Sequence, residues 1–315
     1  MNYVKLIIGL VLLTGGAHAL VEGSKNLALK LNIRPIVVGL TIVAMATSFP
    51  ELLVSLTSAL KGSDGMAVGN IVGSNIANIA LVLALAALIR PFKVEKQTLR
   101  FDFPVLLGIT GLFCCFIWDE KLVWGEGVSL LVILSAYVIY CIKTSAHKSD
   151  IQNEKPHGSK LVNLILILIG SAVVIGGAYL LVVGGVGIAR SYNINEAVIG
   201  LTILAIGTSL PELAATVTAA IKNQNEIGIG NIIGSNIFNF ALVIGIVPCV
   251  LALRKSGPLK FELMKVDVFM MVAVVAGLYG LIWITKEKKF GRVAGACFLL
   301  SYFIYIIYRF KPGII

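Results

Sequence analysis

One long stretch of this chain occurs twice. Residues 39–82 read GLTIVAMATSFPELLVSLTSALKGSDGMAVGNIVGSNIANIALV, and residues 200–243 read GLTILAIGTSLPELAATVTAAIKNQNEIGIGNIIGSNIFNFALV. The two agree at 24 of 44 positions without a gap, at a constant offset of 161 residues. Such self-similarity predicts an internal duplication. Each copy places a glutamate, Glu51 or Glu212, inside an otherwise apolar segment. The fold must bury both carboxylates in apolar surroundings, and this requirement constrains it most strongly.

The composition places the duplicated unit in a membrane. The chain has 315 residues, of which 58% are hydrophobic and only 13% are charged, and its mean hydropathy is +0.95. Soluble domains carry about 25% charged residues. The net charge of +10 does not indicate nucleic-acid binding, because the Lys and Arg residues lie between apolar runs, where they would face the membrane surface. No hydrolase or kinase motif is present, so we expect no enzyme.

Apolar runs predict ten membrane-spanning helices, since a span needs about 20 mostly apolar residues. They are expected near residues 4–22, 35–60, 65–89, 103–118, 122–142, 161–189, 196–221, 227–252, 266–285 and 291–309.

Five helices in each copy have a geometric consequence, because the second copy must then enter the membrane from the opposite side. The predicted fold is therefore an all-α membrane protein of two inverted five-helix repeats, with broken helices at the midplane. The first repeat is expected at 1–142 with its motif at 39–82, and the second at 161–315 with its motif at 200–243. Residues 143–160 are expected to form a polar linker loop.

The positive charges predict the orientation. With the N-terminus outside, 16 of the 26 Lys and Arg residues fall in cytoplasmic loops, which favours extracellular termini for a multi-pass protein of the plasma membrane. The expected partners are inorganic cations and the lipid bilayer, with no nucleic acid, and a monomer would suffice.

The carboxylates stand in a chemical setting suited to hard cations. Each glutamate follows a Thr-Ser-x-Pro sequence, and proline breaks a helix because it lacks an N–H and clashes with the carbonyl four residues back. Freed carbonyls, hydroxyls and a carboxylate then lie within one turn. Hard oxygens of this kind suit Ca²⁺ and Na⁺ rather than thiolate-seeking metals.

The later part of each motif adds more oxygen ligands. Ser74 and Asn78 are four residues apart on one helical face, as are Ser235 and Asn239, so four helices can contribute to one central cage. A divalent cation would neutralise both carboxylates, and no Lys, Arg or His lies in the apolar core of either motif. Glycines spaced four apart at 69 and 73, and at 230 and 234, would let another backbone approach. Ser55, Thr57, Ser58, Thr216 and Thr218 are interpreted as structural. Asn70 and Asn231 fit ligands or helix caps equally well.

At these residues a family resemblance is plain. The pair TSFPE…GNIVGSNIAN and GTSLPE…GNIIGSNIFN resembles the two alpha repeats of the sodium/calcium exchanger family, within the cation/calcium exchanger superfamily. The resemblance implies alternating access by sliding of the first and sixth helices, with Ca²⁺ and Na⁺ as transported ions and no cofactor. It implies Ca²⁺ ligands at Glu51 and Glu212 and at the backbone carbonyls of Thr47 and Thr208. The implied Na⁺-site residues are Ala44, Ser48, Ser74, Ala205, Ser209 and Ser235, with Asn78 at the centre.

Two differences from other members of the superfamily bear on the alternatives. Several relatives carry Asp where this chain has Asn239, which argues against K⁺ dependence. Proton/calcium exchangers of the superfamily show a G-N-A-A-E-H pattern around the glutamate, and this chain lacks it. Na⁺/Ca²⁺ exchange is therefore the predicted function, with proton-coupled exchange of Ca²⁺ or another divalent cation as the alternative and a cation channel as the third.

Overall fold

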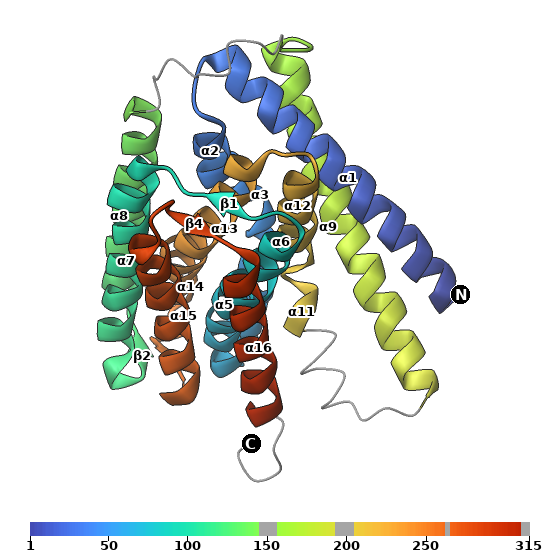
Figure 1. Ribbon diagram of the computed structural model, residues 1–315. Coiled ribbons are helices and arrows are strands. Elements are labelled where there is room, and N and C mark those ends of the chain that lie inside the picture. Colours follow the sequence, from blue (N-terminus) through green and yellow to red (C-terminus); the bar gives the residue numbers. More distant parts are fainter. Residues whose placement is uncertain (145–155, 193–204, 262–264, 310–315) are drawn as a thin grey trace. The chain divides into compact units, whose positions relative to one another are not determined.

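The computed structural model describes residues 1–144, 156–192, 205–261 and 265–309, and leaves out residues 145–155, 193–204, 262–264 and 310–315. The described chain is almost entirely helical (Figure 1). Within it, nine helical segments are long and apolar enough to cross a membrane. They are Asn2–Leu31, Pro35–Leu60, Asp64–Ile89, Thr98–Asp119, Trp124–Thr144, Lys160–Ser191, Asn225–Leu253, Lys265–Ile284 and Arg292–Arg309. The prediction of an all-α membrane protein is thereby confirmed.

The tenth predicted helix, near 196–221, falls partly on residues outside the described ranges. Its described part consists of α11 (Ala205–Gly207) and α12 (Leu210–Ile221), and α12 alone is shorter than a span. Most of the predicted linker at 143–160 also lies outside the described ranges. The tenth helix and the linker thus stay predictions.

The longest helices are α1 (Asn2–Leu31) and α9 (Lys160–Ser191), with 30 and 32 residues. They lie side by side (Figure 1) and make the most extensive helix–helix contact in the described chain. The predicted end of the first helix near residue 22 is wrong, because α1 continues to Leu31. A prediction from hydropathy ends the helix at Glu22 because this residue is charged. In the structure, the Glu22 carboxylate accepts a hydrogen bond from Asn26 at 3.1 Å and forms an ion pair with Lys222 at 2.8 Å. The helix therefore continues through a charged turn.

Glycines let α1 and α9 approach closely. A Cβ atom on Gly9 would lie 2.8 Å from the Gly177 carbonyl oxygen, and one on Gly16 would lie 2.9 Å from the Gly170 carbonyl oxygen. Gly170 and Gly177 follow Gly9 and Gly16 by 161 residues, so exchanging the two copies converts one contact into the other. Small residues of this kind allow backbones to meet in membrane helix pairs.

Both motifs, together with the residues that flank them, form broken helices followed by a long helix that contains a π-helical turn. The first consists of α2 (Pro35–Val38), η1 (Gly39–Val43), α3 (Ala44–Thr47), α4 (Phe49–Leu60), α5 (Asp64–Ala77), η2 (Asn78–Leu83) and α6 (Ala84–Ile89). The described part of the second consists of α11, α12, α13 (Asn225–Phe238), η6 (Asn239–Val243) and α14 (Ile244–Leu253).

Four more helical segments complete the described fold with two short strand pairs. The helices are η3 (Thr98–Asp102) with α7 (Phe103–Phe116) and η4 (Ile117–Asp119), α8 (Trp124–Thr144), α15 (Lys265–Ile284) and α16 (Arg292–Arg309). Strand β1 (Phe92–Lys93) pairs antiparallel with β4 (Lys289–Phe290), and β2 (Lys121–Leu122) pairs antiparallel with β3 (Leu259–Lys260). The segment Thr98–Asp119 runs from β1 to β2, so these pairs lie at opposite ends of a membrane-length helix (Figure 1).

The chain divides into two compact units. The first comprises Met1–Pro50 and Val138–Gly234, and the second comprises Glu51–Tyr137 and Ser235–Ile315. Each unit therefore combines segments from both copies of the duplication, and its hydrophobic packing joins residues distant in sequence. In the first unit, Leu20 and Val21 of α1 share a core cluster with Ile167, Ala215 and Ile227.

Candidate functional site

The first motif breaks its helix where proline was predicted to break it. Helix α3 ends at Thr47, Ser48 adopts a turn with φ −79° and ψ 0°, and α4 begins at Phe49. Pro50 is the second residue of α4, where a missing N–H costs no helical hydrogen bond. Glu51 follows in the first turn, with 0% of its surface exposed. The break therefore holds a carboxylate in the protein interior beside the start of a helix.

The second motif repeats this break. Helix α11 ends at Gly207, Ser209 adopts φ −85° and ψ 3°, and α12 begins at Leu210 with a proline in its first turn. Glu212 lies in that first turn and is also 0% exposed. The predicted proline breaks are confirmed in both copies. Thr208 lies in the turn, and Ala205 begins α11.

The two serines of the breaks have buried hydroxyls with no partner. Within the described chain, the Oγ atoms of Ser48 and Ser209 are buried and make no hydrogen bond. Most buried side-chain polar atoms do find a partner, and leaving one unsatisfied costs about 1–3 kcal/mol. Matched unsatisfied hydroxyls, one in each copy and each three residues before a buried glutamate, therefore indicate positions where a cation would supply the missing interaction.

The hydroxyl of Thr47, by contrast, serves the scaffold. Thr47 Oγ1 donates to Asn231 Oδ1 at 3.0 Å, and Asn231 Nδ2 donates to Thr216 Oγ1 at 3.1 Å. The Ala44 carbonyl accepts from the backbone N–H of Ser48 at 2.9 Å. These bonds all lie within the first compact unit. They fix the turn that carries the Thr47 carbonyl.

Asn70 makes the matching bond in the second unit. Its Nδ2 donates to Ser55 Oγ at 3.1 Å, and Ser55 Oγ donates to the Ala67 carbonyl at 3.0 Å. Asn70 and Ser55 correspond to Asn231 and Thr216 at the offset of 161. The structural interpretation of Ser55 and Thr216 is thus confirmed, and both asparagines tie the two helices of their motif together.

A second group of polar side chains lies where α5 meets η2 and α13 meets η6. Asn78 Nδ2 donates to Asn236 Oδ1 at 3.1 Å, and Asn239 Nδ2 donates to Asn75 Oδ1 at 3.1 Å. All four asparagines are 0% exposed. The Oδ1 atoms of Asn78 and Asn239 have no hydrogen-bond partner among the described residues. Two buried amide oxygens, one from each copy, are therefore available to a cation.

Sequence reasoning placed Ser74, Ser235, Asn78 and Asn239 on these helix faces, and the structure buries all four. It did not predict the roles of Asn75 and Asn236, although both are identical in the two copies, which is the signal that could have identified them. It also missed the π-helical turns, which start at Asn78 and Asn239. Such turns often occur at functional sites.

The predicted glycine contacts are confirmed only in the second copy. A Cβ atom on Gly230 would lie 2.5 Å from the Ile36 carbonyl oxygen, and one on Gly234 would lie 2.5 Å from that of Leu40. For Gly69 and Gly73, no described atom lies within 4 Å of such a Cβ.

Among the described residues, no three His, Cys, Asp or Glu side chains gather closely enough to hold a metal ion. A cation bound at Glu51 or Glu212 would therefore need hydroxyl, amide and carbonyl oxygens as further ligands. This fits the residue types of both motifs, and it fits Ca²⁺, which takes about 6–8 oxygen ligands including backbone and amide carbonyls.

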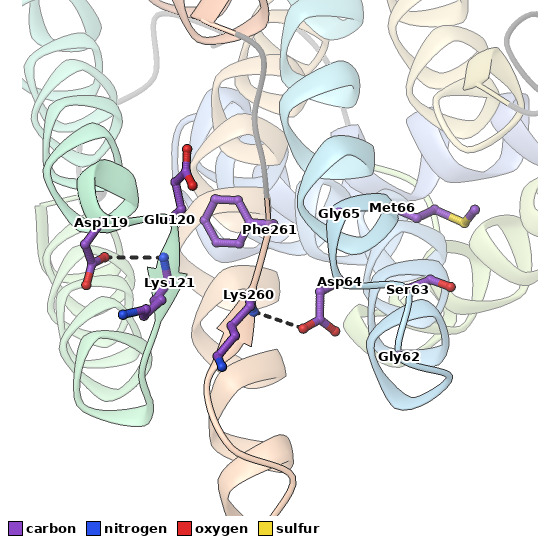
Figure 2. A pocket seen from close by; sticks show the side chains of 10 residues that line it. All are labelled: Gly62, Ser63, Asp64, Gly65, Met66, Asp119, Glu120, Lys121, Lys260 and Phe261. Atoms are coloured by element: carbon purple, nitrogen blue, oxygen red, sulfur yellow. Dashed lines mark hydrogen bonds between the residues drawn. The ribbon is translucent and has the colours of Figure 1, made fainter. Parts of the chain in front are cut away.

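A surface cavity of about 630 Å³ lies elsewhere in the second unit (Figure 2). It contains none of the predicted site residues. Asp64 accepts from the Lys260 backbone N–H at 2.9 Å, and Asp119 accepts from that of Lys121 at 3.3 Å. These acids anchor strands β2 and β3, so the cavity has a structural explanation.

Several known proteins match this chain over most of its length. A family model described as sodium/calcium exchanger protein matches residues 1–143 and 162–311. The sodium/calcium exchanger MaX1 of Methanosarcina acetivorans is 29% identical over 354 residues, covering 98% of this chain and 99% of that protein. A solved structure of the sodium-calcium exchanger NCX_Mj, soaked with Na⁺ and Ca²⁺, matches with a TM-score of 0.83 and 33% identity, covering 98% of each chain. The Ca²⁺/H⁺ antiporter ChaA of Bacillus subtilis is 25% identical over 281 residues, covering 82% of this chain and 78% of that protein.

Proposed function

The chain belongs to the sodium/calcium exchanger family, and we propose that it is a secondary antiporter that exchanges Ca²⁺ for Na⁺ across the membrane by alternating access. The observation that carries the proposal is the matched pair of breaks. Each holds a fully buried glutamate three residues after a buried serine hydroxyl that has no partner among the described residues. A carboxylate in a membrane costs about 2.5–3.5 kcal/mol on insertion scales, so a bound cation gives both groups a physical reason to be there.

Ca²⁺ is bound by the groups with the most negative charge. Glu51 and Glu212 supply carboxylate oxygens, and Thr47 and Thr208 supply backbone carbonyls from the turns that precede them. The hydrogen bond from the Thr47 hydroxyl to Asn231 supports this assignment, because it fixes the turn through the side chain and does not use the Thr47 carbonyl oxygen.

Na⁺ is bound by the same carboxylates together with neutral oxygens. These come from Ser48 and Ser209, from Ser74 and Ser235, from the amides of Asn78 and Asn239, and from the carbonyls of Ala44 and Ala205. The buried, unpartnered oxygens of Ser48, Ser209, Asn78 and Asn239 support the assignment. Because Ca²⁺ and Na⁺ share the two glutamates, binding of one ion excludes the other. This competition for the glutamates couples the movement of the two ions in opposite directions.

We further infer ten helices arranged as two inverted five-helix repeats, at 1–142 and 161–315, joined by a linker at 143–160. Exchanging the copies converts the contact of Gly9 with Gly177 into that of Gly170 with Gly16. It also converts the Asn78–Asn236 bond into the Asn239–Asn75 bond. Reciprocal contacts of this kind are expected of repeats related by a two-fold axis.

The protein is placed in the cell membrane with both termini outside, on the distribution of its Lys and Arg residues. A monomer contains both motifs and suffices for exchange. Sliding of α1 and α9 as a pair would give alternating access, and their close glycine contact supports a pair that moves together.

A proton-coupled Ca²⁺ exchanger is the second candidate, and the match to ChaA favours it. Two buried carboxylates could carry protons in the return step. The experiment that decides is uptake of radiolabelled Ca²⁺ into proteoliposomes loaded with Na⁺ or with choline, each with and without an imposed pH gradient. The proposal expects uptake only with internal Na⁺. Uptake that follows the pH gradient and ignores Na⁺ would establish the second candidate instead.

A further inference from the structure

Two buried asparagines outside the proposed set of ligands bond to two asparagines inside it. Asn236 Oδ1 accepts from Asn78 Nδ2, and Asn75 Oδ1 accepts from Asn239 Nδ2, each at 3.1 Å. All four lie in the second compact unit, so the arrangement stands on contacts within one body. Asn75 and Asn236 are also 161 residues apart and identical in the two copies.

Amide chemistry gives these bonds a directional consequence. The Nδ2 atom of asparagine only donates and the Oδ1 atom only accepts, yet the two ends have nearly the same shape. A flipped amide would turn an NH₂ group toward a cation and repel it. The orientation of Asn78 and Asn239 therefore decides whether each attracts or repels the transported ion.

For Asn78, the structure contains a contact that sets this orientation. No such contact orients the amide that faces Asn239, because the Nδ2 atom of Asn75 is buried with no hydrogen-bond partner in the described chain. Asn236 Nδ2 lies 3.4 Å from the backbone carbonyl oxygen of Asn75. A carbonyl can only accept, so this contact directs the nitrogen of Asn236 toward it and leaves its oxygen for Asn78. Asn78 must then use its nitrogen for that bond, and its oxygen stays buried with no partner in the described chain.

We propose that Asn75 and Asn236 are positioning residues, which fix the amides of Asn239 and Asn78 so that oxygen and not nitrogen faces the transported cation. The inference rests on the proposed function and deepens it. Hydrogen-bond partners that orient metal ligands typically contribute about 10–100-fold in metal affinity. Asn236 is anchored by a backbone carbonyl, so its effect exceeds that of Asn75.

The test compares exchange by Asn75→Ala and Asn236→Ala with that of the wild-type protein in Na⁺-loaded proteoliposomes. The expected result is a rise of about 10–100-fold in the half-saturating concentration of Na⁺, with the maximal rate much less affected. Asn75→Leu and Asn236→Leu, which fill the space that alanine leaves, keep the comparison valid if an alanine variant does not fold.

A rescue separates positioning from simple helix packing. Aspartate has oxygen at both ends and needs no orientation, so Asn239→Asp should make the effect of Asn75→Ala much smaller. Asn78→Asp should do the same for Asn236→Ala. The crossed combinations, Asn75→Ala with Asn78→Asp and Asn236→Ala with Asn239→Asp, are matched controls and should show no rescue.

The outcomes distinguish this inference from the proposed function. The positioning role would be overturned if each alanine variant raised the half-saturating Na⁺ concentration by the same factor whether its partner position holds asparagine or aspartate. It would also be overturned if both alanine variants kept the half-saturating Na⁺ concentration of the wild type. Absence of Na⁺-driven Ca²⁺ uptake in the wild-type protein would instead overturn the proposed function.

Discussion

The hydroxyl of Thr47 donates a 3.0 Å hydrogen bond to Oδ1 of Asn231, which lies 184 residues away in sequence. Asn231 uses its other end as well, because its Nδ2 atom donates to Thr216 at 3.1 Å. Both ends of the amide are thus engaged within the protein. The sequence left a ligand or a helix cap open for Asn231, and its hydrogen bonds show a third role, in which its side chain joins α13 to Thr47 of α3 and Thr216 of α12.

Removing the Thr47 hydroxyl should weaken Ca²⁺ binding indirectly. Thr47→Val keeps the shape of the side chain but leaves the buried Asn231 oxygen without this donor, at a cost of about 1–3 kcal/mol. We expect a lower midpoint of thermal unfolding and weaker Ca²⁺ binding, because the turn that carries the Thr47 carbonyl loosens. Thr47→Ser keeps the hydroxyl and should stay close to the wild type; equal losses in both variants would contradict this role.

The serine hydroxyls of the breaks should behave in the opposite way. Ser48→Ala and Ser209→Ala remove groups that have no hydrogen-bond partner among the described residues, so the ion-free protein should be no less stable. Exchange should nevertheless require more Na⁺ for half-saturation. The control is Ser55→Ala, which removes a hydroxyl bonded to Ala67 and Asn70 and should lower stability. Thermal unfolding without Na⁺ and Na⁺ titration of exchange are measured for all three variants. If the three behaved alike in both measurements, the assignment of Ser48 and Ser209 to the Na⁺ site would be contradicted.

Close approach of α1 and α9 gives a test of their pairing. A Cβ on Gly16 would lie 2.8 Å from the Val174 backbone nitrogen, whereas one on Gly15 would have no described atom within 4 Å. Gly16→Ala should therefore destabilise the protein by about 1–3 kcal/mol, as overpacking does. Gly15→Ala should be neutral or slightly stabilising, because alanine favours helix. Thermal unfolding of both variants measures the difference, and equal midpoints would contradict close packing at this position.

Protons should compete with Ca²⁺ for the two buried carboxylates. Acidification should raise the half-saturating Ca²⁺ concentration while leaving the maximal rate little changed, because excess Ca²⁺ displaces the protons. Initial rates across a Ca²⁺ titration at several pH values, with the Na⁺ gradient held constant, provide the measurement. A fall in maximal rate at unchanged half-saturation would argue against competition at these groups.

The features that could be predicted from sequence are those determined by residues close together in the chain. Proline acts within one turn, so the breaks at Ser48 and Ser209 were predictable, and a carboxylate repeated in an apolar motif had to be buried. The length of α1 was not predictable from hydropathy, because the charge of Glu22 is offset by Lys222, 200 residues away.

The amide bonds of Asn75 and Asn236 likewise join segments about 160 residues apart. Their partners depend on how α5 and α13 pack, which no local pattern encodes. The π-helical turns begin at Asn78 and Asn239, but an asparagine followed by apolar residues does not by itself predict such a turn.

The central claim is that Glu51 and Glu212 bind the exchanged cations. It is tested most directly by the initial rate of Na⁺-driven Ca²⁺ uptake into proteoliposomes containing Glu51→Gln or Glu212→Gln. Glutamine keeps the size of the side chain and removes its charge, so both variants should insert normally and lose Ca²⁺ uptake. Glu287→Gln is the matched control, because Glu287 is exposed and forms only a 3.8 Å surface ion pair with Lys289; it should transport as the wild type does. Retained Ca²⁺ uptake in both the Glu51 and the Glu212 variants would contradict the account.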